Sequence, residues 1–355
     1  MSDWMAEQAS GWHWSYHDYQ PEQEPLREAL CTLGNGSFAT RGAAPESTAD
    51  DTHYPGTYLA GGYNRAKSEV KGRVIENEDL VNLPNWLPLR LRFADGDWFD
   101  LDQVELLDYR QTLAMRDGIL LREMRVREPG GRETQLRQRR LVHMKDQHLA
   151  ALETELTACN WSGSVEVVSA LDGGVINDGV ERYRGLENSH LEPLESESID
   201  DDGIYLKVRT RQSRLEIALA ARTRAYRGAY GSDHAGAHGG THGTTHSGDQ
   251  RIALDAHVER EPDQITQRFQ LQLEPNQPVT IEKLIALFSS SDTAITECGQ
   301  EARAAIGPLP RFQTLHENNA AHGANCVKLS SDGGLAFINQ TLMLVGYRST
   351  TRLAP

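Results

Sequence analysis

The sequence has few cysteines, and they are widely spaced. Four occur in 355 residues, at Cys31, Cys159, Cys298 and Cys326, and no two of them form a CxxC motif. Disulfide frameworks in small domains and cysteine-based zinc sites both use closely spaced cysteines. We therefore expect reduced thiols in a cytoplasmic protein.

Long apolar runs and an excess of basic charge are also missing. The most apolar short run is Leu284–Phe288 (LIALF), whereas a membrane-spanning helix needs about 20 apolar residues. The first residues, MSDWMAEQASGW, show no basic stretch followed by an apolar one, so we expect no targeting segment. The net charge of −15, from 36 basic and 51 acidic residues, disfavours nucleic acid or an anionic membrane as a partner.

Between Trp86 and Phe288, apolar and polar residues alternate in short runs. These runs lie at 87–93, 165–169, 204–208, 215–219 and 269–273. Glycine-containing turn sequences lie among them, at 95–96, 129–131, 172–174 and 202–203. A period of two predicts half-buried antiparallel strands, and no insertion of helical length interrupts them. The fold class is therefore predicted as mainly β, with a large antiparallel β-sandwich over residues 1–290.

Helical patterns occur on either side of these strands. Residues 25–33 predict a short helix that begins near Pro25 and ends at Gly34. Residues 291–307 predict a second helix, capped by Ser291 or Asp292 and ended by Gly307, which we assign to a linker at 291–310. The remaining residues, 311–355, are weakly patterned and predict a short helical tail, with one helix expected at 337–347.

Two glycines flank Asn35 in the sequence Leu33-Gly34-Asn35-Gly36, which predicts a tight turn with positive φ. Either the turn is structural, or it brings Asn35 and Arg41 toward a ligand or a neighbouring domain.

Three clustered arginines, Arg137, Arg139 and Arg140, lie among apolar residues in the strand region. We interpret them as the solvent-facing side of a strand. The alternative, a phosphate or nucleic-acid patch, agrees poorly with the acidic charge of the chain.

A low-complexity segment at 228–248 contains His234, His238, His242 and His246 at intervals of four. On a helix this spacing would stack metal ligands, but the glycines of this segment oppose a helix. We expect a disordered hairpin loop that binds nickel or zinc adventitiously at most, and no dedicated metal site.

A segment from His53 to Leu89 combines aromatic rings, amides and carboxylates, a mixture typical of polar surfaces. Its carboxylates Glu76, Glu78 and Asp79 are expected to bond backbone or arginine rather than to catalyse a reaction. The alternatives for its aromatic and amide residues are a domain or subunit interface, a sugar contact and plain surface. The candidates for interface or sugar contact are Tyr54, Tyr58, Tyr63, Asn64, Asn77, Asn82, Asn85 and Trp86.

Four stretches resemble glycoside hydrolase family 65, the maltose, trehalose and kojibiose phosphorylases. They are REALCTLGNGSFATRG (27–42), HYPGTYLAGGYNR (53–65), ENEDLVNLPNWLPL (76–89) and RLVHMKDQHLAAL (140–152). The resemblance implies the N-terminal β-sandwich of that family, followed by its linker helix. It also implies an (α/α)6 barrel that contains the general-acid glutamate and the phosphate site.

Such a barrel needs on the order of 300 residues, so residues 311–355 hold at most a remnant or the start of one. No catalytic residue is assigned to this chain, and its status as an enzyme is left open. No cofactor is expected, since inorganic phosphate is a co-substrate in the full-length family. An α-linked disaccharide is the expected ligand, if there is one.

Three hypotheses follow. The chain is an inactive part of a truncated or split phosphorylase whose barrel is encoded separately, or a stand-alone carbohydrate-binding or assembly module, or an independent enzyme using its own carboxylates. We favour the first. A sandwich that lacks its barrel should expose an apolar patch, which predicts a homodimer or other self-association.

Overall fold

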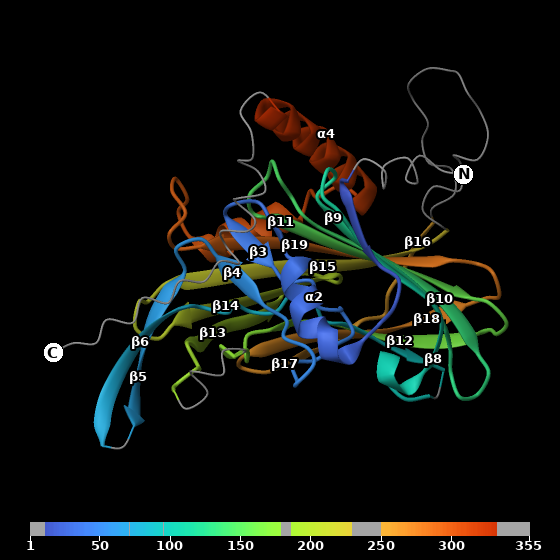
Figure 1. Ribbon diagram of the computed structural model, residues 1–355, viewed down its shortest axis with the longest axis horizontal. Coiled ribbons are helices and arrows are strands. Elements are labelled where there is room, and N and C mark those ends of the chain that lie inside the picture. The colour runs from blue at the N-terminus through green and yellow to red at the C-terminus, as the bar shows by residue number, and fades with distance from the viewer. Residues whose placement is uncertain (1–10, 71, 95, 179–185, 229–249, 332–355) are drawn as a thin grey trace.

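The computed structural model describes residues 11–70, 72–94, 96–178, 186–228 and 250–331. Antiparallel strands dominate the chain, which confirms the predicted fold class of a mainly β, antiparallel sandwich (Figure 1). The helices are η1 (Pro21–Gln23), α2 (Glu24–Leu30), η2 (Leu101–Gln103), α3 (Cys298–Ile306) and α4 (Phe312–Ser331).

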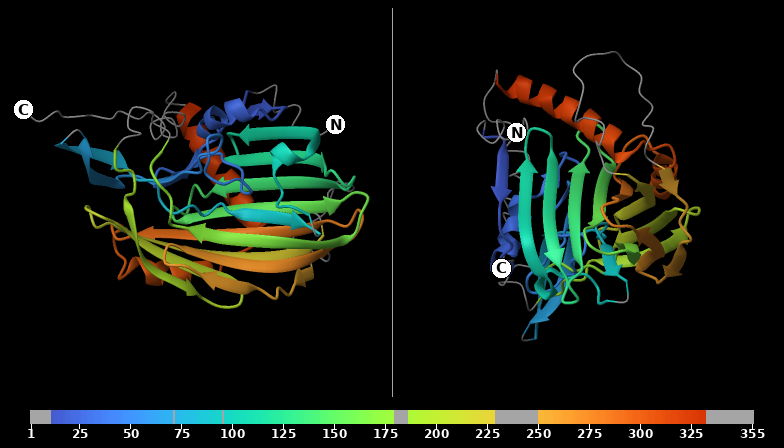
Figure 2. Two further views of the ribbon diagram at one scale, coloured as in Figure 1. Left: turned by 90° about the horizontal axis from the view of Figure 1, so that it is seen from below. Right: turned by 90° about the vertical axis from the view of Figure 1, so that its right-hand side faces the viewer.

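The largest sheet crosses the whole molecule (Figure 2). Its path runs β1-β8-β9-β10-β11-β19-β15-β14-β13, and β16 pairs with β15 at the side. Its strands are β1 (His13–Tyr16), β8 (Glu105–Ala114), β9 (Ile119–Arg127), β10 (Glu133–Val142), β11 (Leu149–Ala158), β13 (Leu191–Ser198), β14 (Gly203–Thr210), β15 (Glu216–Arg227), β16 (Gln250–Ile252) and β19 (Val279–Ser289).

A four-stranded sheet, ordered β17-β18-β12-β7, packs against this sheet and completes the sandwich. Its strands are β7 (Leu89–Phe93), β12 (Gly163–Asp172), β17 (His257–Arg260) and β18 (Gln264–Leu273). Two smaller sheets lie beside the sandwich. They comprise β2 (Leu33–Gly34), β3 (Phe38–Thr40) and β4 (Thr57–Leu59), and the hairpin of β5 (Tyr63–Val70) and β6 (Arg73–Leu80).

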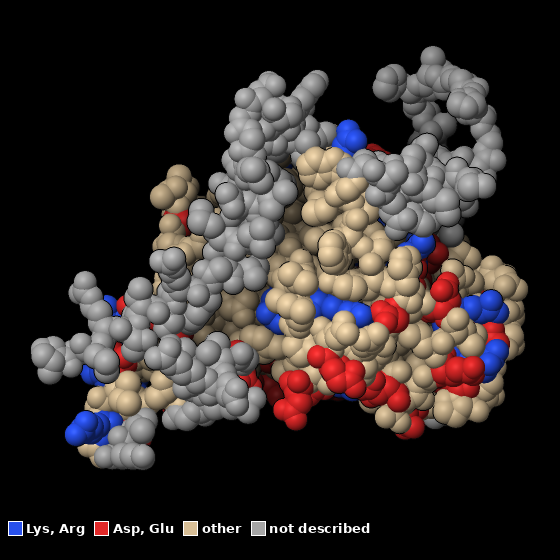
Figure 3. Space-filling model, viewed as in Figure 1, with Lys and Arg blue, Asp and Glu red and all other residues tan. Residues whose placement is uncertain are grey.

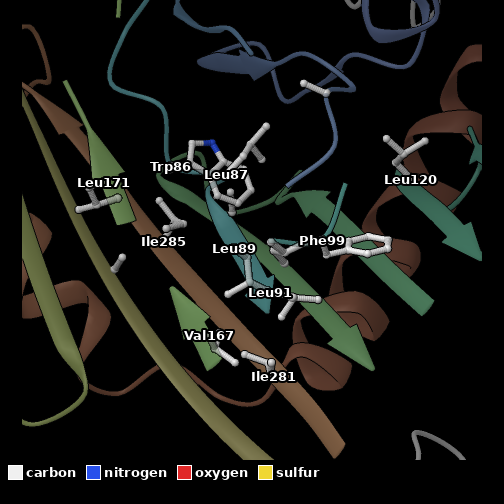
Figure 4. Packing of buried hydrophobic residues seen from close by; sticks show 14 of the residues in the cluster. Trp86, Leu87, Leu89, Leu91, Phe99, Leu120, Val167, Leu171, Ile281 and Ile285 are labelled. Atoms are coloured by element: carbon white, nitrogen blue, oxygen red, sulfur yellow. The ribbon is translucent and has the colours of Figure 1, made fainter. Parts of the chain in front are cut away.

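The main core lies between the two large sheets. In β7, Leu89, Leu91 and Phe93 are buried while Arg90 and Arg92 reach the surface, as the alternation predicts. Figure 4 shows leucines of β7 facing apolar side chains of β12 and β19. The strand β19 is buried along its whole length because the core covers one face and helices cover the other.

The predicted linker helix exists, but it begins later than expected. It starts at Cys298 because Glu297, not Ser291 or Asp292, caps it by accepting hydrogen bonds from the backbone N–H groups of Gly299 and Gln300, both at 2.8 Å. It packs on the outer face of β15 and β19 in a second apolar cluster.

The helix α4 continues this second cluster through Phe312 and Leu315. Its Asn319 accepts a hydrogen bond from the Met144 N–H at 2.7 Å and donates one to the Asp117 carbonyl at 2.7 Å. The part of 311–355 described by the structure is therefore docked on the sandwich. The helix expected at 337–347 lies outside the described residues, as do His234, His238, His242 and His246.

The N-terminal segment covers one end of the large sheet. The predicted helix at 25–33 is shorter, ending at Leu30, because Leu33–Gly34 joins the small sheet. The Asn35 turn is structural, since its amide donates to the His143 carbonyl at 2.9 Å and Gly36 has a φ of 88°. Figure 3 shows acidic side chains gathered on the face of the molecule that carries α2.

The interpretation of the arginine cluster as a solvent-facing strand side was wrong for two of its three members. Arg139 and Arg140 are buried, while the Arg137 side chain is one-third exposed. Arg139 forms an ion pair with Glu153 at 2.6 Å beneath α4, and its guanidinium lies over the Phe312 ring. Arg139 and Arg140 are buried because segments from distant parts of the sequence cover them. The alternation of residues within one strand does not reveal this cover.

None of the helices in the described residues is long and apolar enough to cross a membrane.

Candidate functional site

The segment from His53 to Leu89 folds into β4, the β5–β6 hairpin and a buried connection into β7. The hairpin projects from the body of the sandwich (Figure 1). Its exposed apolar side chains are Tyr63, Val74 and Ile75, with exposed fractions of 50%, 71% and 39%. An isolated two-stranded hairpin is marginally stable in water. The exposed apolar side chains of this hairpin therefore favour a further packing contact.

The amides of this segment hold loops together rather than facing solvent. Asn64 is buried, and its Oδ1 accepts hydrogen bonds from the backbone of Gln212 and Ser213 at 3.0 Å each. Its Nδ2 lies 3.0 Å from the Nδ1 atom of His190. Asn64 therefore fixes the base of the hairpin to the β14–β15 turn.

Asn82 has a similar role one strand later. Its Oδ1 accepts from the Thr57 N–H at 3.1 Å, and its Nδ2 donates to the Ile176 carbonyl at 3.2 Å. Asn85 is also buried, accepts from the Leu87 N–H at 3.0 Å and forms a backbone bridge to Asp172. Asn82 is structural because both of its side-chain groups are committed within the chain, and the Asn85 side-chain oxygen is likewise committed to the backbone.

Trp86 lies in the core, not on a surface. Its side chain has an exposed fraction of 0%, and its Nε1 donates a hydrogen bond to Thr40 Oγ1 at 3.0 Å (Figure 4). The burial of Trp86, Asn64, Asn82 and Asn85 corrects the expectation that all eight candidate residues form one polar surface. A ring of this size stabilises the core by removing apolar area from water.

The remaining candidates lie nearer the surface. Tyr54 is half-buried, accepts a hydrogen bond from the Asp178 N–H at 2.9 Å and packs under the Arg41 guanidinium. Tyr58 is also half-buried beside Gly56, where a Cβ would lie 2.7 Å from the Tyr58 hydroxyl oxygen. Asn77 is half-buried in β6, and its amide donates to Asp79.

A groove of about 320 Å³ lies at the base of the hairpin. It joins β5 and β6 to two loops that are distant in sequence, and its lining includes Asn64, Lys67, Glu76, Glu187 and Arg211. The guanidinium of Arg211 donates to the Leu191 carbonyl at 3.2 Å and to Ser189 Oγ at 3.1 Å. No local pattern identified Glu187, Ser189, Arg211 and Gln212, since their loops meet the hairpin only in the folded chain.

Of the three candidate carboxylates of the hairpin, Glu78 and Asp79 form structural contacts. Glu78 forms an ion pair with Arg65 at 2.7 Å, as expected for a strand-face carboxylate. Asp79 Oδ2 lies 3.4 Å from His190 Nε2. Glu76 remains exposed at the groove.

Burial raises the pKa of two carboxylates of the large sheet that are already engaged by arginines. The pKa of Glu153 and that of Glu282 are raised by burial, and each carboxylate pairs with an arginine. Raised carboxylate pKa values also occur in ion pairs with a structural role, so they do not by themselves identify a catalytic acid. The absence of a catalytic residue from this chain stays a prediction.

Three potential metal ligands, Glu216, Glu297 and Cys298, come within 4.8 Å of one another. The Lys207 ammonium lies between the two carboxylates, 2.7 Å from Glu216 and 2.8 Å from Glu297. Burial raises the pKa of the Cys298 thiol to about 11, which disfavours the thiolate that metals prefer. This cluster is therefore an ion-pair network that fixes the start of α3.

Comparisons with known proteins agree with this architecture. Residues 14–325 match the description "Glycosyl hydrolase family 65, N-terminal domain". An uncharacterized glycosyl hydrolase of Mycobacterium tuberculosis (strain ATCC 25618 / H37Rv) is 40% identical over 304 residues, covering 86% of this chain and 21% of its own length. A kojibiose phosphorylase of Caldanaerobacter subterraneus subsp. tengcongensis is 31% identical over 210 residues, covering 59% of this chain and 26% of its own.

Among solved structures, a human-microbiome protein assigned as a kojibiose phosphorylase aligns with a TM-score of 0.69 at 16% identity. The alignment covers 88% of this chain and 37% of that one, and at this identity it supports the fold alone. The matched region and the β-sandwich with its following helix define an N-terminal domain of a carbohydrate-active enzyme family. The chain belongs to glycosyl hydrolase family 65 and spans about a fifth to a quarter of these curated relatives.

Proposed function

We propose that this chain is the scaffold part of a family-65 phosphorylase or hydrolase that acts on α-glucosidic disaccharides, and that it is inactive alone. The observation that carries the proposal is the match of 14–325 to the family's N-terminal domain, while the curated relatives are about four to five times longer than the matched region. The phosphate site and the general acid would then lie in the remainder of the enzyme, encoded in the same or a separate reading frame.

The described carboxylates support inactivity. An inverting phosphorylase needs a protonated acid beside the glycosidic oxygen, with phosphate attacking from the opposite face. The buried carboxylates Glu46, Glu153 and Glu282 are each paired with an arginine, so they are poorly suited to donate a proton to substrate.

The test is phosphate-dependent release of glucose 1-phosphate by the purified chain from kojibiose, trehalose and maltose. The proposal predicts no release above a protein-free blank. It also predicts that the part of the Mycobacterium tuberculosis relative that this chain does not match, expressed separately, binds this chain in pull-down assays. Release by the chain alone would refute the proposal.

The second candidate is a carbohydrate-binding or assembly module, and the groove at the base of the hairpin favours it. Its volume of about 320 Å³ is within the range of small-molecule sites, and amide, cationic and acidic groups line it. Calorimetry with the same disaccharides should show binding that is lost in Arg211→Ala and retained in Arg137→Ala, whose side chain lies on β10 outside the groove. Trp86→Ala is unsuitable for this test because Trp86 lies in the core.

Exposed apolar side chains favour assembly of two copies or of this chain with a barrel. Leu26 and Leu30 lie one turn apart on α2 with exposed fractions of 62% and 47%, and Val74 and Ile75 lie on the hairpin. Sedimentation velocity of the chain at about 100 μM should show self-association. A Val74→Lys variant should shift the protein toward monomer if the hairpin forms the contact.

A further inference from the structure

Beneath the N-terminal segment, the inner face of the large sheet changes from apolar to polar. There β8, β9 and β10 place Gln111, Arg122, Gln138 and Arg140, all of them buried. The segment 42–45 closes over them and leaves a cavity of about 20 Å³. The polar side chains therefore meet the backbone of 42–45 at this cavity, and the core leucines Leu120 and Leu152 complete its lining.

The two arginines at this cavity differ in their ion pairs. Arg122 forms an ion pair with Glu46 and donates to Gln138 Oε1 at 2.9 Å. Arg140 donates to the Ala43 carbonyl at 2.9 Å, but no carboxylate of the described residues lies within ion-pair distance of it. Two arginines thus share one carboxylate at this cavity.

Other carboxylates near Arg140 are committed elsewhere. Glu28 accepts a hydrogen bond from the Tyr54 N–H at 2.9 Å and lies 2.9 Å from His53 Nδ1 and 3.6 Å from Arg41. Glu46 is shared by Arg122 and Gln138. Within the described residues, the Nε–H groups of Arg122 and Arg140 have no hydrogen-bond acceptor.

Burying an unpaired guanidinium is costly unless another charge compensates it. Burial lowers the pKa of Arg140 to about 10, which agrees with an uncompensated positive charge. A water molecule would satisfy the free N–H donors but would leave the charge unbalanced. A cation would be repelled by the two guanidinium groups, whereas an anion satisfies both the free donors and the unpaired charge of Arg140.

We propose that this cavity binds a monatomic anion, chloride in the cell, between Arg122 and Arg140. Its volume of about 20 Å³ exceeds the ~10–15 Å³ that one water requires, but it is too small for phosphate or a sugar. The bound anion neutralises Arg140 and joins the N-terminal cover to β9 and β10. The site is separate from the groove at the hairpin and does not depend on the proposed enzymatic role.

Crystals of the full chain soaked in sodium bromide test the site directly. The proposal predicts an anomalous bromide peak inside the cavity, within contact of both guanidinium groups. Bromide peaks on the protein surface with a water or no density in the cavity would overturn it.

Thermal unfolding tests the same site in solution. Sodium chloride is exchanged for sodium gluconate at constant ionic strength, so that screening does not change. The Tm of the wild-type protein should rise with chloride concentration, as for any ligand that binds the folded state alone. Arg140→Met should abolish this response, whereas Arg137→Met, on the opposite face of β10, should retain it.

A wild-type Tm that is independent of chloride would overturn the proposal, as would a chloride response that survives in Arg140→Met. If Arg140→Met fails to fold, the wild-type titration and the bromide crystals still decide the matter.

Discussion

Lys283 should be uncharged in the folded protein, and this can be measured. It lies in β19 with an exposed fraction of 0%, between the two large sheets. Its Nζ donates to the Ala170 carbonyl at 2.7 Å and to the Pro88 carbonyl at 3.0 Å. A neutral amine has two N–H donors, which these carbonyls satisfy, whereas an ammonium would bury a third. Burial lowers the pKa of Lys283 well below its usual range.

The sign of the effect on stability follows from proton binding. Below about pH 10.4 the unfolded chain protonates this lysine, while the folded chain does not at any pH above its lowered pKa. Between these two values the unfolded state binds one proton more. The free energy of unfolding therefore gains about 1.4 kcal/mol per pH unit as the pH rises.

Lys283→Met removes this difference in proton binding. Urea unfolding of the wild-type protein and Lys283→Met, measured at a series of pH values up to about pH 10, should give a stability difference that grows by about 1.4 kcal/mol per unit above the lowered pKa of Lys283. Other groups that titrate in this range are present in both proteins, so their contributions cancel.

Lys207→Met is the matched control. Although burial disfavours its ammonium, hydrogen bonds to Glu216 and Glu297 raise the pKa of Lys207, so the lysine is charged in both states below about pH 10.4. Its stability difference from wild type should be flat over the same range. A flat difference for Lys283→Met as well would refute the reasoning.

Three further predictions concern the core and its charges. Trp86→Ala should lower the free energy of unfolding by about 3–5 kcal/mol, while Tyr63→Ala should stay within about 0.5 kcal/mol of wild type, both measured in urea. Arg139→Met should cost about 3–5 kcal/mol because it leaves the Glu153 carboxylate buried without its partner, and the double variant Arg139→Met/Glu153→Leu should recover most of that loss. Burial disfavours the Glu297 carboxylate, but hydrogen bonds from Lys207 and from the backbone of Gly299 and Gln300 lower the pKa of Glu297 to about 2. Its stabilisation is therefore present above about pH 4.3 and is lost toward pH 2. Glu297→Gln should therefore lower Tm at pH 7, and circular dichroism should show this difference shrink as the pH falls.

The strands could be predicted because alternation records one buried face. Leu89, Leu91 and Phe93 face the core in the order that the sequence shows. The start of α3 was less predictable, because Ser291 and Asp292 are also of residue types that cap helices well. The helix begins at Glu297, whose carboxylate is in addition held by Lys207 from β14.

The candidate surface was harder to predict than the strands. Asn64 and Trp86 are of residue types that occur on binding surfaces, but their partners lie far away in sequence, at His190 and Thr40. The same limitation explains Arg140, whose covering residues come from segment 42–45. Composition shows that a segment is rich in polar groups, whereas the distant partner of each group decides whether it is buried.

The most direct test of the scaffold assignment is turnover of an α-glucosidic disaccharide by this polypeptide without any added protein. Incubation with phosphate and kojibiose, trehalose or maltose should leave glucose 1-phosphate at the level of the blank. Turnover by the chain alone that disappears in Glu76→Gln or Glu187→Gln, the two carboxylates of the groove, would contradict the account.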